Sequence, residues 1–129
     1  MQFLGVLLAA VAGFGVGAVW YMSLSGPWMI AAGRTKEELE ADKDPTPFII
    51  AAVAAILAAG LMRHMFVTGD VSGIFRCMMY GAGIGAFLIA PWVILHYAFA
   101  ARPKALWWID GLHTVLAFAV MGLVLGIFI

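Results

Sequence analysis

Side chains able to exchange protons gather around one connection late in the chain. Asp110 and His113 are three residues apart, so they share one face of a helix. A tight turn at Arg102 would bring the preceding helix back beside them, and that helix ends with His96 and Tyr97. The Asp110 carboxylate could also accept hydrogen bonds from Arg102. These five residues form the predicted polar cluster.

Three roles are open for the polar cluster. In the first, an Arg102–Asp110 pair holds two helices together, and the histidines bond to it or to lipid headgroups. In the second, the cluster binds a ligand or handles protons, because an ionisable group in lipid is costly unless it faces the bundle or a wet cavity. In the third, a histidine acts as a base oriented by Asp110, in an enzyme that acts on a lipid.

The sequence carries no signature of a metal, a nucleotide or a covalent catalyst. There is no HxxH or HExxH element and no Gly-x-Ser-x-Gly elbow, and Cys77 is the only cysteine. We therefore predict no catalytic, metal or cofactor-binding residue and expect no enzyme activity. The formal net charge is zero and no basic run exists, which argues against nucleic acid as a partner.

The elements that must position the cluster follow from composition. Hydrophobic residues make up 65% of the chain and charged residues 11%, too few charges for a soluble surface. Stretches long enough to cross a membrane run over residues 3–24, 47–65, 74–99 and 105–129. The first lacks the basic n-region of a signal peptide, so we expect it to be retained. The prediction is one all-α transmembrane domain of four helices in a compact bundle.

The first connection, residues 27–44, is predicted to hold short helices at the membrane surface. The apolar run from Trp28 is too short to span, Gly26 and Pro27 would break the helix before it, and Gly33 would end it. Thr35 and Glu38 have the spacing of a capping box, which predicts a second short helix from there.

Three aromatic residues are candidates for lining a cavity on the side of the first and third connections: Trp20, Tyr21 and Trp92. Aromatic residues at the end of a spanning helix, such as Trp20 and Tyr21, more often anchor the helix at the headgroup boundary. Trp92 follows Pro91, whose missing N–H should kink the third helix.

Each spanning stretch carries small residues four apart, which places them on one helix face. Small residues let helix backbones approach closely, and close packing drives helix association in lipid. The predicted packing positions are Gly13, Gly17, Ala55, Ala59, Gly81, Gly85, Gly122 and Gly126.

Lysine and arginine counts predict the orientation. The first and third connections hold five of them, against Arg63 and Arg76 at the second. The positive-inside rule therefore places the first and third connections in the cytoplasm and both termini outside.

The chain resembles the DUF1761 family of small bacterial proteins with four predicted spanning helices. The resemblance rests on Gly17-x-x-Trp20-Tyr21, on the run from Gly26 through Trp28 to Gly33-Arg34-Thr35, and on Arg102-Pro103, Ile109-Asp110 and His113. It covers nearly the full length and implies a four-helix protein of the bacterial inner membrane, with no assigned activity.

From these patterns we expect a protein that acts by association in the membrane, as a homo-oligomer or as an accessory subunit of a larger complex, with lipids as its other partners. The alternative is a minimal oligomeric transporter or channel whose site is the polar cluster.

Overall fold

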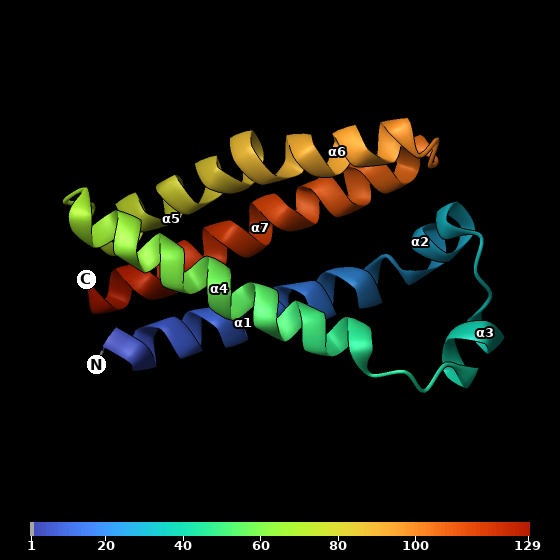
Figure 1. The fold of residues 1–129 in the computed structure, drawn as a ribbon, viewed down its shortest axis with the longest axis horizontal. Coiled ribbons are helices and arrows are strands. Elements are labelled where there is room, and N and C mark those ends of the chain that lie inside the picture. The colour runs from blue at the N-terminus through green and yellow to red at the C-terminus, as the bar shows by residue number, and fades with distance from the viewer. Residues whose placement is uncertain (1) are drawn as a thin grey trace.

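The computed structural model describes residues 2–129 and contains four long helices (Figure 1). They are α1 (Gln2–Ser23), α4 (Thr46–Thr68), the segment Ile74–Phe99 and α7 (Lys104–Phe128). Each is long and apolar enough to cross a membrane, and the described residues contain no strand. The predicted all-α fold with four membrane-spanning helices in a compact bundle is confirmed.

The second spanning helix is longer than the predicted range 47–65. α4 runs to Thr68 because nothing breaks it before Gly69. The Thr68 hydroxyl donates to the carbonyl oxygen of His64 at 2.8 Å. Arg63 and His64 therefore lie within the helix, and only the segment after Thr68 turns.

The third spanning segment is interrupted by a wide turn. It consists of α5 (Ile74–Ile84), a π-helical turn η1 (Gly85–Ile89) and α6 (Ala90–Phe99). The Ala90 N–H donates to the Gly85 carbonyl, five residues back. Pro91, which has no N–H to donate, follows directly. The chain thus accommodates the proline with a π turn and remains one continuous span.

The packing centre of the bundle is α7, which contacts α1, α5 and α6. Its seam with α5 is very close: a Cβ added at Gly122 would lie 2.2 Å from the Cys77 carbonyl oxygen, and one at Gly81 would lie 2.2 Å from that of Phe118. Gly85 lies against the backbone of Thr114 in the same way. Only residues without a side chain fit between these backbones.

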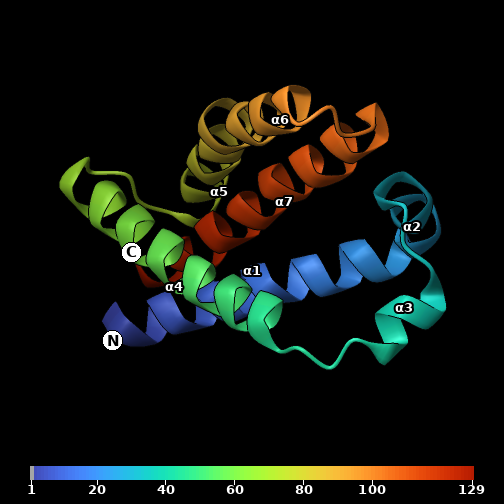
Figure 2. The ribbon, with the colours of Figure 1, turned by 45° about the vertical axis from the view of Figure 1, so that its right-hand side comes forward.

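α4 lies across α1 and leaves much of its own surface open (Figure 2). Ala59 and Met62 on its inner side are fully buried and Ala55 is half-buried. On the other side of α1, a Cβ at Gly13 would meet the Met121 side chain of α7 at 2.7 Å. α1 is therefore held between α4 and α7.

The first and third connections lie at one end of the bundle, and both ends of the described chain lie at the other (Figure 1). The first connection holds α2 (Ser25–Ala32) and α3 (Lys36–Ala41). Gly26 and Pro27 were expected to end the first helix, but the helix is interrupted earlier, at Leu24. They lie in the first turn of α2 instead, where backbone amides have no partner within the helix and a proline costs little.

Candidate functional site: a tyrosine–aspartate cluster joining three helices

The carboxylate of Asp110 joins three helices. Its Oδ1 atom accepts a hydrogen bond from the Tyr21 hydroxyl of α1 at 2.5 Å. Its Oδ2 atom accepts one from the Tyr97 hydroxyl of α6, also at 2.5 Å. Asp110 itself belongs to the second turn of α7, and all three side chains are partly buried. Both oxygens of the carboxylate are therefore used within the bundle.

A neighbouring contact fixes the same end of α1. The indole Nε1 of Trp20 donates to the Ile109 carbonyl oxygen at 2.8 Å. Trp20 and Tyr21 thus bind consecutive residues of α7, one through the backbone and one through a carboxylate. The end of α1 is attached to α7 by two hydrogen bonds that each span 89 positions of sequence.

His113 lies one turn further along α7, against the same face of α1. Its ring packs on the Tyr21 ring with centroids 5.0 Å apart. A Cβ added at Gly17 would lie 3.0 Å from His113 Nε2. Gly17 and Tyr21, four apart on one face of α1, therefore both lie against the imidazole, and the glycine provides the space for it.

The expected ion pair between Arg102 and Asp110 does not form. Arg102 is exposed, and the ion pairs within residues 2–129 join other residues. The α6–α7 turn closes through its backbone instead: the Arg102 N–H donates to the Tyr97 carbonyl at 2.9 Å, and the Arg102 carbonyl accepts from Trp107 Nε1 at 3.2 Å. Tyrosine hydroxyls take the place at Asp110 that the arginine was expected to fill.

His96 and Trp92 lie apart from this cluster. α6 turns Ala90 and Ile94 toward Gly111 of α7, and Tyr97 follows on that face. Trp92 and His96 lie on another face, where His96 is exposed and Trp92 is 60% exposed. The Trp92 ring packs near that of His96, with centroids 6.2 Å apart, and Trp92 lines neither of the two hollows described below.

Two surface hollows lie away from the polar cluster. One of about 430 Å³ is lined by Met79, Tyr80, Gly83, Ile84 and Leu88 on α5 and η1. One of about 250 Å³ lies between α1 and α4. Both are almost wholly apolar, so they suit a lipid chain or another helix better than a polar solute.

Chemically, the cluster offers a carboxylate and an imidazole on one helix face. Within residues 2–129, no three His, Cys, Asp or Glu side chains come together as a metal site would require. The carboxylate is occupied by two phenols, and the imidazole is covered by Tyr21. In this conformation the arrangement holds helices together.

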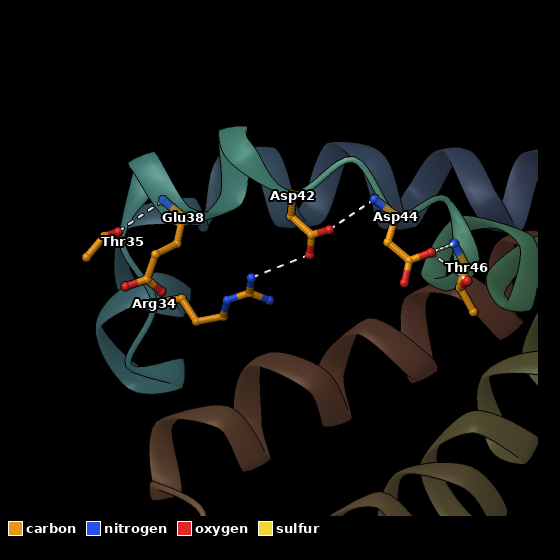
Figure 3. A network of polar contacts seen from close by, with 6 residues as sticks. All are labelled: Arg34, Thr35, Glu38, Asp42, Asp44 and Thr46. Atoms are coloured by element: carbon orange, nitrogen blue, oxygen red, sulfur yellow. Dashed lines mark hydrogen bonds and ion pairs between the residues drawn. The ribbon is translucent and has the colours of Figure 1, made fainter.

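A second polar network organises the first connection (Figure 3). Thr35 Oγ1 accepts from the Glu38 N–H at 3.1 Å, the predicted cap of α3. Arg34 lies 3.6 Å from Asp42, which in turn accepts from the Asp44 N–H at 3.0 Å.

The network continues into the start of α4. Asp44 accepts from both the hydroxyl and the N–H of Thr46 (Figure 3). These two bonds hold the pKa of the Asp44 carboxyl below its ordinary value. In the connection between α3 and α4, the carboxylates of Asp42 and Asp44 thus each accept a hydrogen bond from a backbone N–H two residues later. The Asp44 carboxylate, which is ionised, lies next to the start of α4.

Sequence reasoning placed Tyr21 and Tyr97 near the cluster but missed that they share one carboxylate. The sequence signal for this arrangement was the spacing of Gly17 and Tyr21. It places a residue without a side chain and a hydroxyl on one face of α1. The partner of that face is set by packing, which no local pattern reveals.

Comparison with known proteins identifies a family. The family described as "Protein of unknown function (DUF1761)" matches residues 4–126. No curated protein and no solved structure matches the chain. Because the family match covers nearly the whole chain, including every residue of the polar cluster, the protein belongs to the DUF1761 family.

Proposed function

We propose that the protein acts by association with other membrane helices, as a homo-oligomer or as an accessory subunit of a larger complex in the bacterial inner membrane. The observation that carries the proposal is the outer face of α5. Its other face is already used, because Gly81 of α5 packs on α7, as does Gly85 at the start of η1. Gly83 points elsewhere: a Cβ added there would meet nothing within 4 Å.

Gly83 lines the hollow of about 430 Å³, together with Met79, Tyr80, Ile84 and Leu88. Tyr80 is 51% exposed and carries a hydroxyl that lipid chains cannot satisfy. A small residue between larger ones accepts a neighbouring helix closely, and a polar group beside it can bond across the contact. This combination supports a helix of another subunit as the occupant.

The test is native mass spectrometry of the protein gently purified from membranes, comparing wild type with Gly83→Leu. Leucine fills the hollow, so we expect Gly83→Leu to lose the assembled species. Gly15→Leu is the matched control, because Gly15 also has open space beside it but lines neither of the two hollows. Gly15→Leu should leave the assembly intact.

The outcomes separate the possible roles. A larger complex in fixed ratio supports an accessory subunit, and a single species built from this chain supports a homo-oligomer. A homo-oligomer that retains a small molecule would instead favour the alternative, an oligomeric transporter or channel using the polar cluster. Wild type found only as a monomer, or equal assembly of Gly83→Leu and Gly15→Leu, would contradict association through this face.

We further propose that the first and third connections face the cytoplasm and that both termini lie outside. Arg34, Lys36, Lys43, Arg102 and Lys104 belong to the end of the bundle that carries α2, α3 and the α6–α7 turn. Only Arg63 and Arg76 lie toward the other end. The five-to-two excess supports this orientation.

A further inference from the structure

We infer that Tyr21 is a removable cover over His113, held closed by its hydrogen bond to Asp110. This inference is independent of the proposed association, because it concerns one protomer. It assigns to the end of α1 a conformational role that the packing of the helices alone does not require.

The cover is defined by two contacts of one side chain. The Tyr21 ring lies on the His113 ring, with centroids 5.0 Å apart and planes inclined by 55°. The Tyr21 hydroxyl donates to Asp110 Oδ1 at 2.5 Å. The ring does the covering, and the hydroxyl fixes the ring in place. Gly17, one turn earlier on the same face of α1, leaves the space that the imidazole occupies, since a Cβ there would lie 3.0 Å from His113 Nε2.

The bond that holds the cover is local and replaceable. A hydroxyl–carboxylate bond is a strong, charge-assisted one, yet it joins only two side chains at the end of α1. The chain breaks helical geometry soon afterwards, at Leu24. A rotation of the Tyr21 side chain would free the hydroxyl while the Trp20–Ile109 hydrogen bond keeps the end of α1 on α7, and without disturbing the glycine seam between α5 and α7.

Opening would expose an acid–base pair. His113 and Asp110 lie three apart on one face of α7, so they would face the same opening. That opening lies at the end of the bundle that holds the first and third connections. The pair would then be able to exchange a proton with water or with a hydrogen-bonding group at the membrane surface.

The test uses the three histidines of the chain, modified with diethyl pyrocarbonate and followed separately by mass spectrometry of the purified protein in detergent. His64 and His96 are exposed and serve as internal references, whereas His113 is half-buried. In wild type we expect His113 to react more slowly than both. In Tyr21→Phe, which keeps the ring and removes the hydroxyl, its rate should rise about tenfold, as expected when a hydrogen bond to a charged group is lost.

Tyr97→Phe is the matched control. It removes a hydroxyl from the same carboxylate at the same distance, but Tyr97 belongs to α6 and the Tyr21 bond stays in place. Its His113 should react at nearly the wild-type rate. The inference is overturned if wild-type His113 reacts as fast as His96, if Tyr21→Phe leaves His113 protected, or if both variants expose it equally, since equal exposure means general loosening.

Discussion

An aspartate within a membrane-spanning helix must find hydrogen-bond donors in the protein, because lipid chains offer none. Asp110 is the only acidic residue in the four spans of this chain, and its two oxygens receive one phenol each. A single side chain thereby ties α1, α6 and α7 together toward the end of the bundle that holds the first and third connections. Of the three roles considered for the polar cluster, these two bonds support the structural one.

Replacing Asp110 by asparagine should therefore destabilise the bundle. The amide keeps the shape but has one acceptor oxygen and no charge, so at least one phenol loses its acceptor. We expect the free energy of unfolding to fall by about 1 to 3 kcal/mol, the usual worth of a hydrogen bond to a charged group. Denaturation in mixed micelles, followed by circular dichroism, measures the difference.

Asp70→Asn is the control for that substitution. Asp70 lies in the α4–α5 turn with a φ of 54°, a conformation that asparagine also adopts readily. Its carboxylate takes part in no side-chain hydrogen bond or ion pair within residues 2–129. Asp70→Asn should unfold like wild type, and equal stability losses in the two variants would argue against the structural role of Asp110.

At the scale of helices, the bundle depends on the backbone contact between α5 and α7. We expect Gly122→Ala to lower the free energy of unfolding by about 3 kcal/mol or more, at the high end for overpacking. The added methyl would lie 2.2 Å from the Cys77 carbonyl oxygen. Since the obstacle is backbone and not a flexible side chain, the helices must separate. The same unfolding measurement in micelles applies.

Gly15→Ala separates this clash from the general effect of replacing glycine in a helix. A Cβ at Gly15 meets nothing within 4 Å, so this variant should be neutral or more stable by up to about 1 kcal/mol, the difference in helix propensity. A Gly122→Ala protein as stable as Gly15→Ala would mean that the seam is looser than described.

The helices were predictable from sequence because hydropathy and length alone define a span. Spacing also singled out Gly81, Gly85 and Gly122, since small residues four apart share a face. The partner helix of that face depends on how the whole bundle packs. The pairing of Gly81 with Gly122 could therefore not be predicted from the sequence near either residue. Pro91 indicated a distortion, but not that a π turn at Gly85–Ile89 would absorb it.

The cluster shows the same limit for side chains. Asp110 and His113 were identified together because their spacing is local to one helix. Tyr21 lies 89 positions from Asp110, and only the packing of α1 on α7 brings them together. Arg102 is close in sequence and was assigned to the carboxylate for that reason. The turn instead directs its backbone to Tyr97 and leaves its side chain in the open.

At the scale of the whole molecule, the charges are unevenly divided between the two ends of the bundle. The end with α2 and α3 carries an ordered surface network, from the cap at Thr35 to the turn at Asp44 (Figure 3). At the other end, the connection between α4 and α5 is a short turn after Thr68. The tyrosine–aspartate cluster and the surface network both lie at the end with α2 and α3. The orientation of the protein in the membrane therefore decides which compartment these two features face.

The orientation can be measured by labelling single cysteines with a membrane-impermeant maleimide in intact spheroplasts. In a Cys77→Ser background, Glu38→Cys marks the first connection and Ser72→Cys the second, and both positions are exposed. The five-to-two excess of lysine and arginine predicts that Ser72→Cys reacts in intact spheroplasts, whereas Glu38→Cys reacts only after permeabilisation. Equal labelling in detergent would verify that both thiols are reactive. The reverse pattern would place the tyrosine–aspartate cluster at the outer surface and contradict the proposed orientation.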